Sequence, residues 1–157
     1  MKLPSRLIAM AFALLLAVQA APVRADDRAD AIAASDAFYA SLAVLDDGTA
    51  MSTVFAQAPY ITFVGPMTRD IVVGWPALQG YFAKVNQRFK RREARIENRA
   101  LHVSGPVAWE VGLEVGEFEL QDGTVLPVNW VVTNIYEKQP DGRWLTVSHH
   151  VQPGAPR

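Results

Sequence analysis

Cysteine is absent from this chain of 157 residues, and histidine occurs only three times. Without cysteine the chain has no disulfide bonds, no thiol nucleophile and no thiolate ligand for a metal ion, and it cannot be a lipoprotein acylated on cysteine. The sequence also lacks a Ser-His-Asp signature, a glycine-rich phosphate loop and a nucleotide-binding fingerprint. The chain must therefore fold by burying an apolar core, and its chemistry must come from other side chains.

The N-terminal apolar run is too short to be a membrane-spanning helix. It extends over 12 residues, Leu7 to Val18, whereas a spanning helix needs roughly 20. Because Lys2 and Arg6 precede this run and small residues follow it, residues 1–25 are predicted to be a Sec-type signal peptide that is cleaved after Ala25. We therefore expect a periplasmic or secreted protein without stable membrane insertion.

The remaining composition is ordinary for one compact domain. Half of the residues are hydrophobic, 10% are aromatic and 20% are charged. There is no repeat, low-complexity segment or internal linker, so residues 26–157 are expected to form a single domain. The formal net charge of −1 becomes more negative once the basic signal peptide is removed, and we therefore expect no nucleic-acid partner.

Helical periodicity is confined to the first part of this domain. Asp30 can cap a helix that ends at Asp46-Asp47-Gly48, and a second, short helix is expected over Thr49–Phe55. Pro76 suits the first turn of a third helix. Apolar residues recur at helical spacing in the first helix (Ile32, Phe38, Tyr39, Leu42, Leu45) and in the third (Leu78, Tyr81, Phe82, Val85, Phe89).

Alternation of apolar and polar residues dominates the rest of the chain. Two short strands are expected at Tyr60–Val64 and Asp70–Val73, and the alternation becomes continuous after Arg92. The long strands predicted from it are Ala94–Val103, Val107–Leu120, Thr124–Lys138 and Arg143–Val151. Helices followed by a meander indicate an α+β fold, in which a curved antiparallel sheet wraps over about three N-terminal helices.

Three stretches, taken in this order, resemble a known family. They are "DDGTAMSTVFAQAPYITFVGP" (46–66), "VGWPALQGYF" (73–82) and "YEKQPDGRWLTVSHH" (136–150). The chain is similar to the SnoaL-like branch of the nuclear transport factor 2 superfamily over about Asp30 to Pro153. The resemblance implies the cone-shaped fold shared with ketosteroid isomerases and the association domain of calcium/calmodulin-dependent kinase. Because this superfamily contains isomerases, dehydratases, cyclases, binding modules and dimerisation domains, it does not by itself imply a function.

The hairpin between the last two strands predicts where the two adjacent histidines point. Pro140-Asp141-Gly142 suits a three-residue loop, and counting outward from it places Asn134 and His150 on one face and His149 on the other. Neighbouring strand residues point in opposite directions, so the two histidines cannot hold one metal ion. This count does not fix which face is concave: the aliphatic residues on the face of His149 favour that face for the core, whereas the resemblance favours the other, and we expect Asn134 and His150 to face the cavity of the cone. The kinase association domain is expected to place an arginine where this chain has Asn134, so an anionic ligand would lose that partner here.

Both faces of the last two strands carry apolar or aromatic residues, but the helices can cover only one of them. A second covering is therefore needed, most simply another copy of the chain. The sequence predicts a homodimer packed through the sheet.

Aromatic residues are candidates for the walls of a cavity. Tyr60, Trp75, Tyr81 and Trp130 either line a site for a flat apolar ligand or pack in the core. Asn134 either donates a hydrogen bond to a ligand oxygen or forms a hydrogen bond with a side chain of the neighbouring strand.

His150 and Glu114 are the candidates for proton transfer. His150 titrates near neutrality, although a lone strand histidine is also commonly structural. Glu114 shares a strand face with Glu110 and two glycines, which leave room beside a carboxylate. The favoured interpretation of that face is nevertheless the solvated side of the strand, because Trp109 and Val111 point the other way.

One run of basic residues precedes the long strands. Its members are Arg88, Lys90, Arg91, Arg92 and Arg95. We interpret this cluster as a solvated surface near the end of a helix.

Three functions remain open. The first is an exported protein that binds a small, largely apolar organic molecule in the cone. The second is an isomerase, dehydratase or cyclase that uses His150 or Glu114 for proton transfer. The third is a dimeric interaction module whose cone is filled, which a cavity well below roughly 300 Å³ would favour. None of the three calls for a cofactor or a metal ion.

Overall fold

The computed structural model describes residues 25–154. The predicted signal peptide lies outside the described residues, apart from Ala25, and stays a prediction. None of the helices formed by residues 25–154 is long and apolar enough to span a membrane.

The order of elements follows the predicted change from helices to strands. The helical segments are α1 (Ala25–Leu42), η1 (Ala50–Thr53), α2 (Trp75–Val85) and η2 (Asn86–Arg88). The strands are β1 (Thr62–Val64), β2 (Val72–Val73), β3 (Phe89–Ser104), β4 (Val107–Leu120), β5 (Val125–Lys138) and β6 (Trp144–Pro153). The helix predicted over Thr49–Phe55 is only the 3₁₀ turn η1. It ends early because Val54 and Ala56 leave the turn to hydrogen-bond with Thr146 of β6, so the described part of the chain has two α-helices instead of about three.

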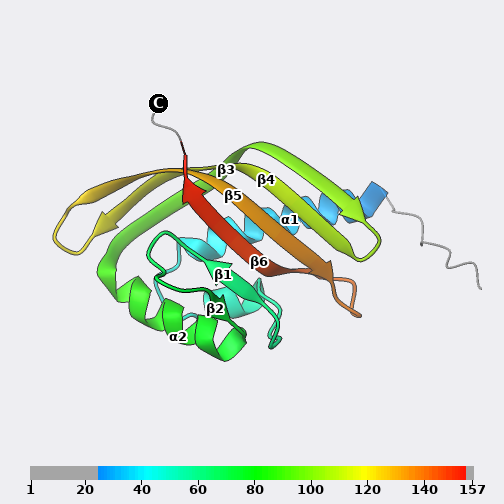
Figure 1. Ribbon diagram of the computed structural model, residues 1–157, viewed down its shortest axis with the longest axis horizontal. Helices are drawn as coiled ribbons and strands as arrows, with labels where there is room; N and C mark the ends of the chain where they lie inside the picture. The colour runs from blue at the N-terminus through cyan, green and yellow to red at the C-terminus, as the bar shows by residue number, and fades with distance from the viewer. Residues whose placement is uncertain (1–24, 155–157) are drawn as a thin grey trace, which may run out of the picture.

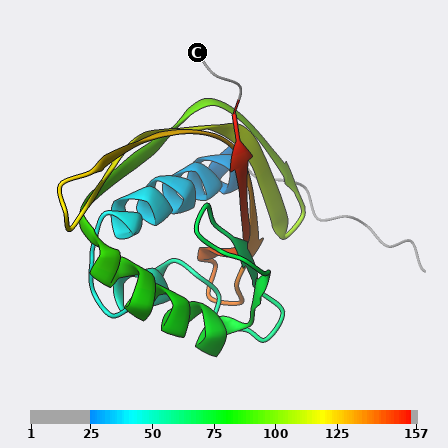
Figure 2. The ribbon, with the colours of Figure 1, turned by 60° about the vertical axis from the view of Figure 1, so that its left-hand side comes forward.

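The strands form one sheet in the order β2-β1-β6-β5-β4-β3. Strands β3 to β6 make the predicted antiparallel meander, whereas β1 pairs with β6 in parallel. Figures 1 and 2 show the sheet curving over α1, with α2 lying below the open side of the curve. The α+β cone predicted from the sequence is therefore confirmed.

The main core fills the space between α1, α2 and the concave face of the sheet. Phe38 of α1, Phe63 of β1 and Phe82 of α2 are almost completely buried in it, together with Phe118 of β4. The rings of Phe63 and Phe82 pack edge to face, with 5.3 Å between ring centres. Burial of these aromatic side chains holds the two helices in the hollow of the sheet.

One stripe of α1 faces the sheet, and it is not purely apolar. Buried positions recur every three or four residues along the helix and include Asp27 and Ser35 as well as Ala31 and Phe38. Lys138 of β5 donates to Asp27 at 2.5 Å, and Ser35 hydrogen-bonds to a carboxylate of the sheet. The helix therefore docks through charged and polar contacts in addition to apolar ones.

The predicted register between β5 and β6 is wrong beyond the first few pairs. The hairpin forms as expected, with Tyr136 opposite Thr146, but Ile135 then lies opposite Ser148, so one extra residue is accommodated in β6. This β-bulge reverses the direction of every later side chain on β6. As a result Asn134 pairs with His149. His149 is buried, whereas His150 is exposed.

Candidate functional site

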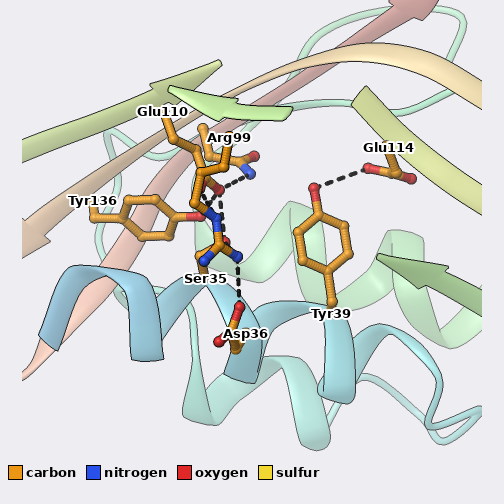
Figure 3. A network of polar contacts seen from close by, with 8 residues as sticks. Ser35, Asp36, Tyr39, Arg99, Glu110, Glu114 and Tyr136 are labelled. Carbon is orange, nitrogen blue, oxygen red and sulfur yellow. Dashed lines mark hydrogen bonds and ion pairs between the residues drawn. The ribbon is translucent and has the colours of Figure 1, made fainter. Parts of the chain in front are cut away.

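A buried carboxylate, Glu110 of β4, lies at the centre of a polar network between α1 and the sheet (Figure 3). Its Oε1 accepts hydrogen bonds from Ser35 Oγ at 2.7 Å, Asn134 Nδ2 at 2.8 Å and the Tyr136 hydroxyl at 2.5 Å. Its Oε2 lies 3.0 Å from Arg99 Nε in an ion pair. A fully buried carboxylate is tolerated only with such partners: the hydrogen bonds satisfy Oε1, whereas Oε2 is compensated by the charge of Arg99 and has no hydrogen bond of its own among residues 25–154.

Arg99 reaches this network because β3 has a bulge. The register between β3 and β4 shifts between Glu97 and Ala100, and Asn98 adopts a positive φ of 53°. The bulge turns Arg99 towards α1, where its Nη2 also donates to Asp36 Oδ1 at 2.5 Å. The arginine thus joins strand, helix and buried carboxylate.

The expectation that Glu110 and Glu114 form a solvated face is wrong. Their side chains are 0% and 2% exposed, whereas Trp109 and Val111, expected to be buried, are about 40% exposed. The predicted alternation of buried and exposed side chains along β4 is correct, but the buried and the exposed faces were assigned the wrong way round. Carboxylates can be buried on the concave side because they have polar partners there, such as Arg99. These partners come from distant parts of the chain, so strand periodicity does not reveal them.

Asn134 connects Glu110 to His149 and sets the tautomer of the imidazole. A carboxylate can only accept, so Asn134 must direct its Nδ2 towards Glu110 and its Oδ1 towards His149. His149 Nδ1 lies 2.7 Å from Asn134 Oδ1 and must therefore carry the proton. The other ring nitrogen, Nε2, is left as an acceptor.

His149 is held as a neutral ring. Burial, together with the charge of the neighbouring His150, lowers the pKa of His149 to about 3. The ring stacks on Phe63 with 4.9 Å between centres and an angle of 19°. Its Nε2 lies 4.0 Å from Glu114 Oε2.

Glu114 of β4 is a second buried carboxyl group of the cone, and it lines a pocket. Burial raises the pKa of Glu114 to about 7, and the Tyr39 hydroxyl and the charge of Arg92 oppose this rise only in part. The Tyr39 hydroxyl donates to Glu114 Oε2 at 3.4 Å (Figure 3). Near neutrality Glu114 is therefore present in both its protonated and its ionised form, beside a histidine nitrogen that can only accept a hydrogen bond.

Glu114 and His149 line a small pocket bounded by α2, the β1–β2 loop and strands β3 to β6. Aromatic and aliphatic side chains make up most of its wall, and Arg92 contributes a charge. Its volume is about 20 Å³, which holds about one water molecule, whereas sites for organic ligands occupy roughly 300 Å³ or more. By the volume criterion given above, the closed pocket favours the interaction module with a filled cone, and an organic ligand can enter only if part of the wall moves.

A larger hollow, of about 960 Å³, lies elsewhere, where β3, β4 and β5 bend beside the C-terminal end of β6. Its polar side chains, such as Glu93 and Glu117, are exposed or half-buried. Groups in contact with bulk water keep nearly ordinary reactivity, so size alone does not make this hollow the reactive site.

The structure brings together only some of the predicted site residues. Tyr81 and Trp130 line the pocket with Glu114. Trp75 packs in the main core instead, and Tyr60 is 56% exposed, with its hydroxyl donating to Glu137 at 2.6 Å. Neither of these two lines the pocket.

Two more predictions about position are corrected. His150 was expected to share the inner face with Asn134, but the bulge in β6 gives that place to His149. Arg92 was expected on a solvated surface, but its side chain is buried. It is covered because η2 ends at Arg88 and the chain enters β3 with Phe89 and Arg92 both turned inward.

Fold and site together define a domain in which a curved sheet and helices enclose a conical interior. A family model for the SnoaL-like domain matches residues 32–154. The chain therefore belongs to the SnoaL-like domain family. No curated protein matches the chain.

Solved structures agree on the fold. The chain is similar to a nuclear transport factor 2-like superfamily protein from Salmonella enterica, with 20% identity, a TM-score of 0.70 and coverage of 79% of this chain and 88% of that one. A ketosteroid isomerase-like protein from Erwinia carotovora has 18% identity, a TM-score of 0.70 and coverage of 85% and 100%. The association domain of C. elegans CaMKII has 13% identity, a TM-score of 0.62 and coverage of 82% and 96%. At such identities the likeness shows the fold alone.

Proposed function

We propose that this chain is an exported protein that binds a small, largely apolar organic molecule in the pocket beside Glu114. The observation that carries the proposal is a buried carboxyl group with a pKa of about 7 lining an aromatic pocket. Apolar walls with a few convergent polar groups are the usual composition of small-molecule sites. Export rests on the predicted signal peptide, and cell fractionation of the tagged full chain tests it.

Ligand entry requires the pocket to widen. Pro66 and Met67, in the loop between β1 and β2, form part of the wall, and Pro66 is exposed on its outer side. Movement of a surface loop is less costly than movement of a paired strand. We infer that this loop yields to the ligand.

A thermal-shift screen tests binding in this pocket. Mature protein is screened with small aromatic and alicyclic ketones, lactones and alcohols, because a ligand present at 100 times its Kd adds about 2.7 kcal/mol of stability. Val85→Phe places a ring in the wall of the pocket and is expected to abolish the shift, whereas Val73→Phe, at a position 55% exposed on β2, should keep it. No shift with any compound would favour the interaction module with a filled cone.

Proton transfer is a second candidate function, favoured by the position of Glu114 in the pocket. Because the pKa of His149 is about 3, the abstraction falls to Glu114, and His149 Nε2 lies 4.0 Å from it as a weak acceptor. The carboxylate form of Glu114 can take a proton from a substrate and its carboxyl form can return it, as in an isomerase or a dehydratase, without a cofactor. The similar protein from Erwinia carotovora is named ketosteroid isomerase-like, which agrees with this class.

Deuterium exchange tests this second candidate. The α-protons of cyclic and aromatic ketones are followed by NMR in D₂O with and without the protein. Glu114→Gln is expected to slow any exchange that the protein catalyses by about 10²-fold or more. Glu117→Gln, on the same strand but exposed, is the matched control. Exchange no faster than in buffer for every ketone would contradict proton transfer and leave binding untouched.

We also propose that the chain forms a homodimer through the outer face of the sheet. Val107, Trp109 and Val111 form a row on β4 and are 38%, 40% and 41% exposed. A row of this kind on a sheet face is typical of a covered surface. One protein of similar fold is an association domain, and its name agrees with self-association. Val111→Lys should produce a monomer in light scattering, and Val44→Lys, at a loop position 46% exposed, should not.

A further inference from the structure

Arg92 is a buried cation with unused hydrogen-bonding capacity. Its side chain is 4% exposed, and its Nε donates to the backbone carbonyl of Leu42 at 2.6 Å. Its Nη2 is also buried but has no hydrogen-bond partner among residues 25–154. A buried N–H without an acceptor is costly, and more so on a charged group.

Aromatic rings surround the guanidinium without satisfying that donor. The Arg92 Cζ lies 5.7 Å from the ring centre of Phe82, 5.5 Å from that of Phe89 and 5.9 Å from that of Phe118. These rings attract the charge through their π faces, but they offer no lone pair to the N–H group. Burial lowers the pKa of Arg92 to about 10, so the group remains charged at neutral pH.

Glu114 attracts Arg92 electrostatically but does not form an ion pair with it. Glu114 lines the same pocket, but within the described chain no ion pair within 4.0 Å joins the two. Tyr81, which also faces Arg92, keeps its proton because burial raises the pKa of its hydroxyl. When Glu114 is protonated the pocket therefore carries one uncompensated positive charge among apolar walls.

We propose that Arg92 binds an anionic oxygen of the ligand, and that the natural ligand is a small aromatic or alicyclic molecule bearing a carboxylate. This inference rests on the proposed pocket and specifies the class of its ligand. A guanidinium favours a carboxylate over any neutral oxygen, because the hydrogen bond is assisted by charge on both sides. One carboxylate oxygen accepts from Arg92 Nη2, and the apolar body packs against Phe118 and Trp130, which share the pocket.

Arg92 can thus serve as the anion-binding arginine of this chain, although it does not lie at the position of Asn134. Asn134 is occupied by its contacts with Glu110 and His149, whereas Arg92 approaches the same interior from β3 and has an N–H to spare. The site thus selects a ligand by the negative charge at one end of the molecule and by the apolar shape of the remainder.

Matched acids and amides test the proposal directly. Isothermal titration of the mature protein compares benzoate with benzamide and phenylacetate with phenylacetamide, so that shape is kept and only the charge changes. We expect each carboxylate to bind at least tenfold more tightly than its amide. Arg92→Met is expected to remove this preference, and Arg91→Met, which deletes the same charge from a side chain 41% exposed on the same strand, is expected to keep it.

Three outcomes would overturn the assignment of Arg92. They are equal binding of acid and amide, failure of both carboxylates to bind, and a preference that survives in Arg92→Met. If Arg92→Met does not fold, the acid and amide comparison on the unaltered protein decides, and Arg92→Lys, which keeps the charge but loses the planar donors, should weaken carboxylate binding. Equal binding of acid and amide that Val85→Phe abolishes would refute the role of Arg92 while leaving the proposed pocket standing.

Discussion

Asn134 of β5 and His149 of β6 are in direct contact, with 2.7 Å between Asn134 Oδ1 and His149 Nδ1. This contact orders the interior of the cone, because Asn134 is held on its other side by Glu110. It fixes the imidazole with its proton on Nδ1 and its free lone pair towards Glu114. The side chain of Asn134 is thus a positioning group for the histidine.

Replacing Asn134 by leucine should destabilise the protein by roughly 2–4 kcal/mol. The change keeps the volume but leaves His149 Nδ1–H without an acceptor and deprives Glu110 of a donor, and each buried group left unsatisfied costs about 1–3 kcal/mol. Urea unfolding measures the loss, and ¹⁵N spectra of the imidazole should show the Nε2–H tautomer appearing.

His150→Ala is the matched control for this change. The side chain of His150 is exposed, so the substitution should alter stability by less than about 0.5 kcal/mol. A large effect of His150→Ala together with a small effect of Asn134→Leu would mean that the register between β5 and β6 is not the one described.

Local patterns were sufficient to predict most elements. The strand expected over Val107–Leu120 has those bounds, and that expected over Thr124–Lys138 differs by one residue. Strand alternation and turn residues are encoded in consecutive positions, and the hairpin before β6 is an example. The succession of helices and meander was therefore enough to indicate a curved sheet over helices, and the family resemblance implied the cone.

Side-chain direction was harder to predict where a strand contains a bulge. The extra residue in β6 lies between a segment that hydrogen-bonds with Val54 and Ala56 and one that pairs with β1, and the bulge in β3 turns Arg99 inward. Both depend on pairing between distant segments. Burial of Glu110 and Arg92 likewise depends on partners from other elements, so residue type alone favoured solvent for both.

The stability contributed by Glu114 should decrease as the pH rises. Its folded pKa of about 7 lies above the ordinary value of 4.5, so between these values the folded chain retains a proton that the unfolded chain has released. The contribution is complete below pH 4.5 and is lost as the pH rises through 7. The difference corresponds to roughly 3 kcal/mol.

Glu114→Gln cannot titrate and isolates this effect. Between about pH 4.5 and pH 8 the stability of Glu114→Gln relative to the unaltered protein should rise by roughly 3 kcal/mol. Urea unfolding at several pH values measures the difference, from which the titration of His149 cancels because both proteins retain it. A difference that does not change with pH would show that the pKa of Glu114 is not raised.

Removing Arg99 should cost roughly 3–5 kcal/mol, because Arg99→Met leaves the carboxylate of Glu110 buried without its counter-charge. Arg95→Met is the control, since the Arg95–Glu97 ion pair is largely exposed and should contribute less than about 1 kcal/mol. Chemical denaturation of both variants gives the comparison.

A double substitution separates the charge effect from lost packing. Adding Glu110→Gln to Arg99→Met removes the stranded charge and should recover part of the stability, so the two losses should not add. Strictly additive losses would indicate that Arg99 stabilises the fold through packing alone.

Gly116 of β4 allows a close approach between β3 and β4. A Cβ atom at this position would lie 2.0 Å from the backbone carbonyl oxygen of Glu93 and 2.9 Å from Ala94 Cα. Both atoms belong to a paired strand, since Ala94 lies opposite Gly116 in the ladder, and neither can move without displacing its neighbours. Gly116→Ala should therefore destabilise the protein by about 3 kcal/mol, the upper range for overpacking.

Gly80→Ala provides the opposite expectation from the same chemical change. Gly80 lies inside α2, where a Cβ atom would meet nothing within 4 Å, so alanine should stabilise the helix by roughly 0.5–1 kcal/mol. Thermal and urea unfolding of the two variants should move in opposite directions. If Gly116→Ala were as stable as the unaltered protein, β3 and β4 could not be as close at this point as the structure places them. The larger hollow of about 960 Å³, which Gly116 lines, would then be less tightly constrained.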